Sequence, residues 1–294
     1  MTQLTSLLAV VRGGSITAAA DELVVTQPSV SAALSALARE VGAELLERSG
    51  RGVRLSPAGA AFAPYAADVV GLLDQGRQAV REAVSDSARR LRIAAVTTAA
   101  ESFVPPLMQA FGAAYPGVAL ALDVGNRERV LSAVLEHRVD VAITGRPPSD
   151  ERIAAVTLRA NEIVLVTAAG DPLARRARVS RQDLEGRTWL LREEGSGTRA
   201  LNEQFLSALH EAPQTLTLGS NGAIKQAARV GLGVSLLSRD AVGAELVSGA
   251  LTTLAVEGLP TPRPWYAVRS TVGPMRRPVA DFLAFLAAEL PTDA

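Results

Sequence analysis

The sequence predicts an α/β protein in two parts: a helix-rich N-terminal part closed by a small hairpin, and a larger part with mostly parallel sheet. Over the first ninety residues, apolar side chains recur at three- and four-residue spacing, which is typical of helices. From Leu91 onward, short apolar strands alternate with helical segments, and this alternation favours parallel sheet covered on both faces. A length of 294 residues is also long for a single compact domain.

The amino-acid composition limits which kinds of binding site and cellular location we expect for the protein. The formal net charge is +0, so any nucleic-acid binding must come from local placement of arginine. The absence of cysteine excludes disulfides and thiolate metal sites. The two histidines, His137 and His210, are far apart, and we expect neither a metal site nor a cofactor. No run reaches the roughly 20 apolar residues of a membrane span, and residues 1–11 lack the positive charge of a signal peptide, so we expect a cytoplasmic protein.

The N-terminal part divides into three short helices. Residues 4–11 carry the first apolar stripe, and two glycines end it. Ser15 can cap a second, alanine-rich helix over 16–23. After a tight connector, Thr26 is a good N-cap for a third helix, whose first turn tolerates Pro28 and which runs to about residue 41.

A hairpin and a long helix follow. Residues 45–55 read as two short strands joined by a glycine turn. Ser56 and Pro57 open a helix that runs to about residue 88 and that Pro64 should kink. The helix carries a stripe at steps of three, four and seven that is typical of packing along a partner: Tyr65, Val69, Leu72, Gly76, Val80 and Ala83.

The larger part is expected to form two lobes, with chain crossings near Asn161 and Pro262. We expect its strands at 91–96, 118–124, 139–144, 163–166, 189–191, 234–237 and 265–268. We expect its helices at 104–115, 127–135, 198–209, 221–230 and 278–290.

The helix, short turn, helix and hairpin together indicate DNA binding. A helix that enters the major groove needs polar side chains in its first turn, where it meets base edges, and its free N–H groups favour phosphate. The hairpin sets three arginines against one acid, Glu47, which suits phosphates or the minor groove. Taken alone, the helix spacing is equally compatible with a small helical bundle in which the Gln and Ser side chains only cap helices.

The segment Gly14–Gly59 resembles the signature of LysR-type transcription regulators, with SxTxAA, then TQPSVS, then LLERxxRxVxLSPAG. The resemblance extends over the whole chain. It implies a winged helix-turn-helix over 1–58, a linker and dimerisation helix over 59–88, and an effector-binding domain over 89–294. That domain is expected to have the two-lobed fold of type 2 periplasmic binding proteins, with lobe I at about 91–161 and 264–294 and lobe II at about 162–263.

The resemblance also implies partners and DNA contacts. A homodimer, probably assembled into a homotetramer, would bind a promoter inverted repeat in double-stranded DNA and contact RNA polymerase, associated with the nucleoid and not with a membrane. Ile16 and Leu46 replace usual phenylalanines of the family, and Ala32 and Ala33 stand where many members carry base-contacting side chains. The candidate DNA contacts are Thr17, Gln27, Pro28, Ser29, Ser31, Arg48, Arg51 and Arg54.

A second group of polar residues follows the predicted strands of the larger part. Carboxyl ends of strands are where open α/β sheets bind ligands. The glycines of the run 192–199 let backbone N–H groups turn inward, and its hydroxyls and arginine favour an anion. For any single residue, an ordinary helix cap or surface arginine is an equal alternative. The candidate effector contacts are Thr97, Thr98, Asn126, Arg127, Arg146, Ser196, Gly197, Thr198, Arg199 and Asn221.

Within the family, the runs REEGSGTR, GSNxAIKQA, GRPP and PxPRPWYAV most resemble the regulators of Calvin-cycle carbon-fixation operons. This resemblance implies a phosphorylated metabolite or NADPH as the small anionic effector. The sequence departs from the subgroup at Gly222, where an acid is usual.

An enzyme is the first alternative, because a transferase can share a two-lobed fold without any DNA function. No nucleophile elbow, HExxH helix or phosphate-binding loop is present, and we expect no catalytic residue. A two-lobed small-molecule-binding protein is the second alternative, and a secreted one would need a signal peptide.

Overall fold

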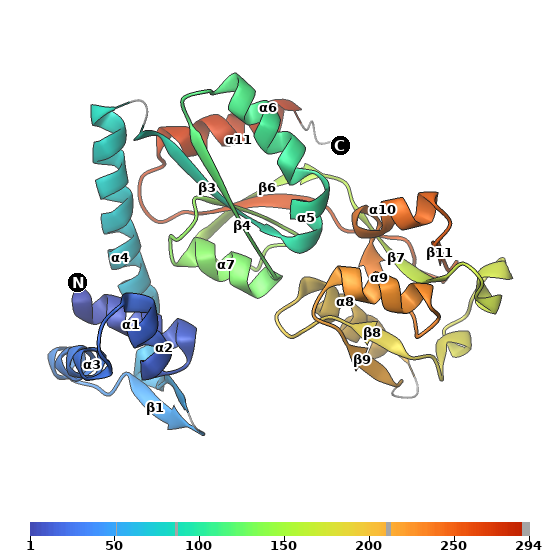
Figure 1. Cartoon of the computed structure of the whole chain (residues 1–294), viewed down its shortest axis with the longest axis horizontal. Coiled ribbons are helices and arrows are strands. Elements are labelled where there is room, and N and C mark those ends of the chain that lie inside the picture. Colours follow the sequence, from blue (N-terminus) through green and yellow to red (C-terminus); the bar gives the residue numbers. More distant parts are fainter. Residues whose placement is uncertain (51, 86–87, 210–212, 290–294) are drawn as a thin grey trace. The chain divides into compact units, whose positions relative to one another are not determined.

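The computed structural model of the chain describes residues 1–50, 52–85, 88–209 and 213–289. It divides into two compact units (Figure 1). Unit 1 comprises residues 1–86, 135–138 and 272–274, and unit 2 comprises residues 87–134, 139–271 and 275–294. Each unit is built around hydrophobic clusters of its own. His210, one of the two histidines considered above, lies outside the described residues.

Unit 1 begins with three short helices, α1 (Thr2–Gly13), α2 (Ile16–Leu23) and α3 (Gln27–Val41). The side chain of Ser15 accepts a hydrogen bond from the backbone N–H of Ala18 at 3.1 Å. Thr26 caps α3 in the same way, by accepting from Ser29 at 3.4 Å. These bonds satisfy N–H groups that the start of a helix leaves unpaired, which explains why the two helices begin where they do.

A hairpin, β1 (Leu46–Ser49) and β2 (Gly52–Leu55), precedes the long helix α4 (Pro57–Val84). Ser56 accepts a hydrogen bond from the N–H of Gly59 at 3.0 Å and donates its hydroxyl to the carbonyl of Glu44 at 2.6 Å. A Cβ at Gly59 would lie 1.9 Å from the carbonyl oxygen of Leu45. Only glycine therefore allows α4 to begin so close to the hairpin. The helix continues through Pro64.

Two faces of α4 have different surroundings within unit 1. One face holds the loop 135–138: the buried ring of His137 is bonded to Asp68 (Nε2 to Oδ1, 2.9 Å) and to Gln75 (Nδ1 to Nε2, 3.0 Å). Gly71 lies against this ring, and a Cβ there would be 2.4 Å from the Cβ of His137. Another face leaves apolar residues of the predicted stripe open to solvent, among them Tyr65, Val69 and Val80.

The turn between α2 and α3 contains a strained residue. Val24 has φ 55° and ψ 46°, the left-handed helical conformation. In that conformation the Cβ of an L-residue crowds its own backbone, and branching at Cβ makes the crowding worse. The side chain is 89% exposed, so little packing offsets the strain.

Lobe I of unit 2 is a five-stranded sheet in the order β4-β3-β5-β13-β6. Its strands are β3 (Arg90–Val96), β4 (Ala119–Gly125), β5 (Val141–Thr144), β6 (Ile153–Arg159) and β13 (Trp265–Ser270). α6 (Val104–Ala114) and α11 (Arg277–Glu289) pack on one face, and α7 (Arg127–Leu135) packs on the other (Figure 1). A one-turn helix, α5 (Thr97–Ser102), follows β3 directly.

Lobe II has two groups of strands: β7 (Glu162–Ala168), β10 (Ser235–Ser238), β11 (Leu251–Thr253) and β12 (Thr261–Pro262), and then β8 (Trp189–Leu191) with β9 (Thr215–Thr217). Its helices are α8 (Gly197–Leu206), α9 (Asn221–Arg229) and α10 (Arg239–Val247), with 3-10 turns at Pro172–Arg175 and Gln182–Leu184. α8 packs with the cluster around Trp189, whereas α9 and α10 pack with the cluster around Leu190.

The sheets are mixed, so the expectation of mostly parallel sheet is wrong in detail. β3 pairs in parallel with β4 and β5, and β8 pairs in parallel with β9. β13 is antiparallel to both of its neighbours, and every partner of β7 is antiparallel to it. The returning strands β11 and β12 are too short to produce a readable pattern in the sequence.

The two lobes are joined by chain segments at Asn161 and Arg263. The backbone N–H of Arg263 donates to the carbonyl of Asn161 at 2.7 Å, and the Asn161 side-chain amide donates to the carbonyl of Arg263 at 3.1 Å. The hydroxyl of Ser238 donates to Oδ1 of Asn161 at 2.6 Å. The two crossing segments are therefore bound to each other at the point where the lobes meet.

A buried ion cluster lies just before β5. The Asp140 side chain is 2% exposed and is bonded to Arg276 at 2.7 Å and to Arg92 at 3.0 Å. Burial alone would raise the pKa of Asp140, but the hydrogen bonds and charges of Arg92 and Arg276 outweigh it and hold the pKa below the ordinary value of 3.8. The ion cluster ties the segment before α11 to β3.

We expect Val24→Gly to stabilise the protein by about 1 kcal/mol, because glycine adopts the left-handed conformation without strain. Urea unfolding with the helical circular dichroism as the signal measures the change. The matched control is Val25→Gly, since Val25 has no positive φ and glycine there should only lose stability. Equal effects of the two variants would contradict the strain at Val24.

We expect Asp140→Asn to lower the free energy of unfolding by about 3 kcal/mol at pH 7, because two arginines would lose their shared carboxylate. The folded-state pKa is depressed, so this stability is present above the unfolded value and is lost as the pH falls through the folded pKa. The gap to the wild type should therefore narrow below about pH 4. The control is Asp123→Asn, which breaks an exposed pair with Arg129 and should change stability by less than about 1 kcal/mol.

Candidate functional site

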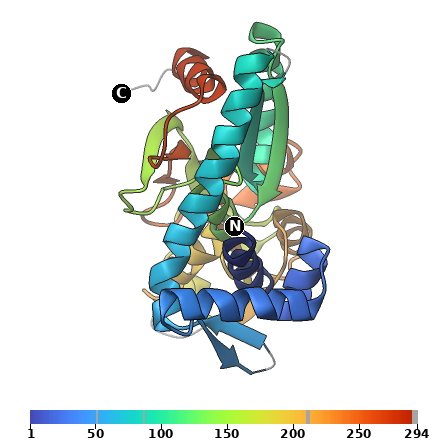
Figure 2. The same cartoon turned by 90° about the vertical axis from the view of Figure 1, so that its left-hand side faces the viewer.

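The first turn of α3 projects from unit 1 into solvent. Gln27, Ser29 and Ser31 are exposed there, as is Pro28, whereas Val30 is buried in the core. In Figure 2, α3 lies across the outer surface of the unit, in front of the other helices. Polar donors and acceptors thus stand at the end of the helix that would meet base edges. Thr17, at the start of α2, is also exposed.

A groove separates α3 from the hairpin. Ser31 and Ser35 line it from the helix, and Leu46 and Val53 line it from the two strands, with Ile16 beside them. Both residues that replace the usual phenylalanines of the family therefore contribute to the apolar lining of the groove, while also packing against the core.

The hairpin is only partly the free cationic wing that the sequence suggests. Arg48 is exposed, but Arg54 is bonded to Glu47 at 2.7 Å. An exposed pair of this kind is weak, so Arg54 can exchange its carboxylate for a phosphate at small cost. Arg51 lies outside the described residues.

A pocket lies between the two lobes of unit 2. Its lining comes from both lobes and from the crossing segments: Val96, Thr97, Thr98, Gly125, Asn126, Arg127, Thr144, Gly145, Asn161, Ile163, Arg192, Ser196, Gly197, Thr198, Leu201, Ser238, Arg263 and Trp265. The starts of α5, α7 and α8 are all in this lining. A helix start carries the positive end of the helix dipole, so these helix starts favour an anion, although at α7 the N–H groups of Glu128 and Arg129 are already bonded to Gly195 and Asn126.

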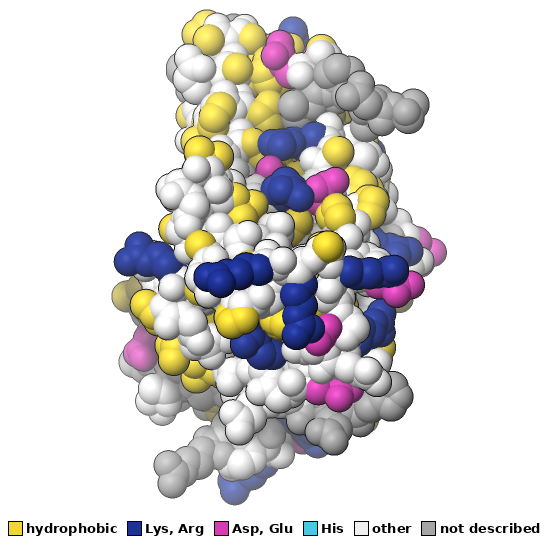
Figure 3. Space-filling model, turned by 90° about the vertical axis from the view of Figure 1, so that its right-hand side faces the viewer, with side chains coloured by type: hydrophobic (Ala, Val, Ile, Leu, Met, Phe, Trp, Pro, Cys, Tyr) yellow, Lys and Arg dark blue, Asp and Glu magenta, His cyan; other side chains and the backbone are white. Residues whose placement is uncertain are grey.

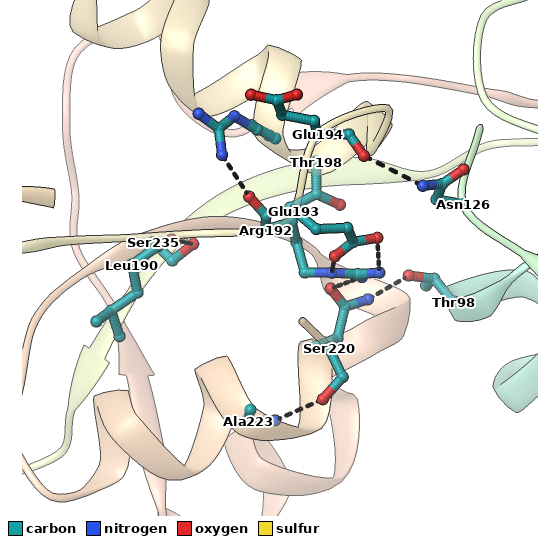
Figure 4. A network of polar contacts seen from close by, with 12 residues as sticks. Thr98, Asn126, Leu190, Arg192, Glu193, Glu194, Thr198, Ser220, Ala223 and Ser235 are labelled. Atoms are coloured by element: carbon teal, nitrogen blue, oxygen red, sulfur yellow. Dashed lines mark hydrogen bonds and ion pairs between the residues drawn. The ribbon is translucent and has the colours of Figure 1, made fainter. Parts of the chain in front are cut away.

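The lobe II side of the pocket contains a fully paired arginine (Figure 4). Arg192 is bonded twice to the carboxylate of Glu193, at 2.7 and 2.8 Å, and donates to the side-chain oxygen of Asn221 at 2.7 Å. Burial raises the pKa of Glu193, but hydrogen bonds, first that from Arg192, outweigh it and leave the pKa lowered. Asn221 in turn donates to the hydroxyl of Thr98 at 2.8 Å.

Among the described residues, several hydrogen bonds cross directly from one lobe to the other. Asp240 of lobe II accepts from the guanidinium of Arg159 at 3.3 Å and from the indole N–H of Trp265 at 2.7 Å, both of lobe I. Besides the bond between Asn221 and Thr98, the side-chain amide of Asn126 donates to the carbonyl of Glu194 at 3.2 Å. The backbone N–H of Glu128 donates to the carbonyl of Gly195 at 3.1 Å. The lobes are therefore in contact around the pocket, in a closed arrangement.

The structure places the candidate effector residues unevenly. Seven of them line the pocket: Thr97, Thr98, Asn126, Arg127, Ser196, Gly197 and Thr198. Asn221 reaches it only through Thr98 and Arg192. Arg146 is exposed, and Arg199 is bonded to Glu203 and to the carbonyl of Arg192, so neither lines the pocket.

Several lining residues were not among the candidates. Thr144 and Arg192 stand in segments that the sequence singled out, Thr144 as the last residue of a strand and Arg192 directly after one, and that position was the available signal. Asn161, Ser238 and Arg263 gave no such signal, because the crossing of two chain segments brings them to the pocket.

The comparisons with known proteins agree with this layout. Residues 1–60 match the model of the bacterial regulatory helix-turn-helix proteins of the lysR family, and residues 85–291 match that of the LysR substrate binding domain. The chain belongs to the LysR family of transcriptional regulators. It is therefore a DNA-binding regulator with an effector domain.

Two curated relatives align with most of this chain, and one solved structure of a regulatory domain aligns with the larger part of it. The transcriptional regulator CbbR of Rhodospirillum rubrum is 40% identical over 282 residues, which is 95% of this chain and 93% of the relative. The RuBisCO operon transcriptional regulator of Allochromatium vinosum is 37% identical over 270 residues, 90% of this chain and 88% of the relative. The regulatory domain of CcmR from Synechocystis PCC6803, solved in complex with 2-PG, has a TM-score of 0.65 and 30% identity over 69% of this chain and 97% of that domain.

Two general features of this LysR-family regulator follow from the described residues. None of the helices described is both long and apolar enough to cross a membrane. In the same part of the chain, no three His, Cys, Asp or Glu side chains gather in a way that could hold a metal ion.

We expect Thr98→Val to loosen the closed arrangement of the lobes, because it removes the acceptor of the buried Asn221 amide. A hydrogen bond of this kind contributes about 1 kcal/mol, so amide exchange in residues 195–199 and 221–224 should accelerate about fivefold. Hydrogen-exchange mass spectrometry measures this. Thr157→Val, on an exposed position of β6, is the control and should leave these segments unchanged.

Proposed function

We propose that this regulator controls carbon-fixation genes and that a small phosphorylated anion, bound between the two lobes of unit 2, sets its affinity for DNA. The observation that carries the proposal is the pocket itself. It combines three helix starts, several hydroxyls and two arginines to which no described Asp or Glu is bonded, in a space between two lobes.

The chemistry of the effector is inferred from the pocket and from relatives. Most of the lining residues carry a hydroxyl, amide or guanidinium group, and such donors suit phosphate or carboxylate oxygens. The solved CcmR domain carries 2-PG, 2-phosphoglycolate, and two relatives are named as CbbR and RuBisCO operon regulators. NADPH, the other effector that the sequence resemblance implies, would likewise present a phosphate.

DNA recognition is assigned to unit 1. We propose that the first turn of α3 reads base edges in the major groove and that the hairpin arginines contact phosphates. The proposed boundaries are a DNA-binding domain over 1–58, a linker helix over 59–88 and an effector domain over 89–294. The exposed apolar stripe of α4 supports a homodimer through this helix, and a homotetramer would bring two such dimers to a promoter inverted repeat.

The remaining parts of the proposal concern cellular context. A regulator of this kind acts on the nucleoid in the cytoplasm, contacts RNA polymerase and performs no catalysis of its own. An effector changes DNA binding only by preferring one arrangement of the lobes over another. A coupling of about 1–3 kcal/mol between the two sites is enough for a graded response.

The proposed effector is tested by adding 2-phosphoglycolate to the purified chain and to its complex with the promoter region beside its gene. We expect a rise in melting temperature, because a ligand that binds only the folded state stabilises it. We also expect a change in operator affinity in a mobility-shift assay. A chain that binds its operator but shows neither response to 2-phosphoglycolate, to NADPH nor to other phosphorylated metabolites would contradict the proposed effector class.

We expect Arg48→Ala and Ser31→Ala to weaken DNA binding in different ways. Arg48→Ala should weaken binding to all sequences about equally and reduce the slope of log affinity against log salt by about 1. Ser31→Ala should cost about 1 kcal/mol on the operator and little on random DNA. Fluorescence anisotropy on both DNAs at several salt concentrations separates the two roles, and equal losses on both DNAs for both variants would contradict them.

A further inference from the structure

One end of the pocket holds positive charge that the protein does not balance. Arg127 and Arg263 line this end, and Arg146 lies close enough for its charge to act on Arg263. Among the described residues, no Asp or Glu side chain is bonded to any of the three. Burial, and after it the charges of Arg127 and Arg146, lowers the pKa of Arg263 below the ordinary value of arginine.

Two buried polar atoms at the same end have no hydrogen-bond partner in the described structure: Nε of Arg127 and the hydroxyl of Thr144. Thr144 is fully buried at the end of β5, and Arg127 donates through another nitrogen to the carbonyl of Arg146 at 3.1 Å. A buried donor without an acceptor is costly. Both residues belong to the lining of the pocket, where an oxyanion would supply the missing acceptor.

The two arginines of unit 2 that are almost fully buried are balanced by carboxylates. Arg192, which also lines the pocket, has its nitrogens bonded to Glu193 and Asn221, and Arg276 is bonded to Asp140. The face of lobe II in Figure 3 carries many Lys and Arg side chains, and Asp or Glu lies beside several of them. The ion pairs on lobe II include Arg178 with Glu257, Lys225 with Glu245 and Arg239 with Glu162. Among the described residues that line the pocket, the arginines without a bonded carboxylate are thus Arg127 of lobe I and Arg263 of the crossing segment.

Arg263 differs from the other two arginines in its place in the fold. Its backbone is one of the two crossing segments, held by both hydrogen bonds to Asn161. Its guanidinium lies beside Gly145, the residue directly after β5: a Cβ built on Gly145 would be 3.5 Å from Nε of Arg263. An anion bound here would be held by lobe I and by the hinge at the same time.

We propose that Arg263 is the residue by which the pocket selects an effector group with two negative charges. This inference rests on the proposed function. A phosphate monoester dianion can accept hydrogen bonds from Arg127, Thr144 and Arg263 together and neutralise two of the guanidinium charges. A carboxylate carries one charge and leaves the cluster cationic. The phosphate therefore binds at this end, and the uncharged or carboxylate end of the effector faces the hydroxyls of Thr98, Ser196 and Thr198.

The experiment compares two ligands that differ only in the phosphate, 2-phosphoglycolate and glycolate, by isothermal titration calorimetry on the full chain at pH 8. We expect Arg263→Gln to lose about 10- to 100-fold in affinity for 2-phosphoglycolate, as for a charge-assisted hydrogen bond, and less than about threefold for glycolate. Arg263→Lys, which keeps the charge but not the two-pronged geometry, should lie between Arg263→Gln and the wild type.

The matched control is Arg129→Gln, which removes one arginine charge from α7 outside the pocket, where Arg129 pairs with Asp123. It should bind both ligands as the wild type does. The circular dichroism spectrum without ligand should match that of the wild type for every variant, which shows that the variants are folded. The inference is overturned if Arg263→Gln keeps wild-type affinity for 2-phosphoglycolate, or if it loses both ligands to the same degree. A wild type that binds no phosphorylated ligand at all overturns the proposed effector function as well.

Discussion

Balance of buried positive charge is the physical constraint on which unit 2 depends. Asp140 supplies a carboxylate to Arg92 and Arg276, and Glu193 supplies one to Arg192. In both places the chain carries its own counter-ion, so the charges serve the fold. At the end of the pocket formed by β5, α7 and the crossing segment, the same residue type stands without a carboxylate. A structural arginine and a ligand-binding arginine therefore differ in where their anion comes from. The chain itself supplies the carboxylate to a structural arginine, whereas a diffusing molecule supplies the anion to a ligand-binding one.

The same constraint bears on how a ligand could act. The lobes are joined by hydrogen bonds at Thr98, Asn126 and Glu128 and by those that Asp240 accepts, and a neutral bond of this kind contributes about 1 kcal/mol net. A ligand that contacts Thr98 of lobe I together with Ser196 and Thr198 of lobe II can do so only while the lobes are closed. Such a ligand would prefer the closed arrangement, and this difference in affinity is what a switch requires.

The sequence predicts elements best where local chemistry decides them. α2, α3 and α7 begin at residues that the caps and the apolar pattern indicate, because Ser15 and Thr26 act on their immediate neighbours. β6, β9, β11 and α10 escaped prediction. β9 is exposed throughout and β6 over much of its length, so neither shows the alternation of a half-buried strand. The antiparallel pairing around β7 depends on strands that return from far along the chain, which no local pattern reports.

The same distinction between local and long-range determinants applies to the residues of the pocket. Residues directly after strands or at helix starts, such as Thr98 and Arg127, can be expected in it from the general behaviour of α/β sheets. Arg263 cannot, because it follows a strand of only two residues, β12, and the crossing of two chain segments bonded at Asn161 brings it to the pocket. Arg199 is the opposite case, because the sequence places it among the candidate effector contacts and the structure does not place it in the pocket lining. It stands in the run that most suggests an anion site, yet one helical turn places its side chain beside Glu203, which satisfies it. A sequence motif locates the backbone of a site, whereas the counter-charges brought by the fold decide which of its arginines remain free for a ligand.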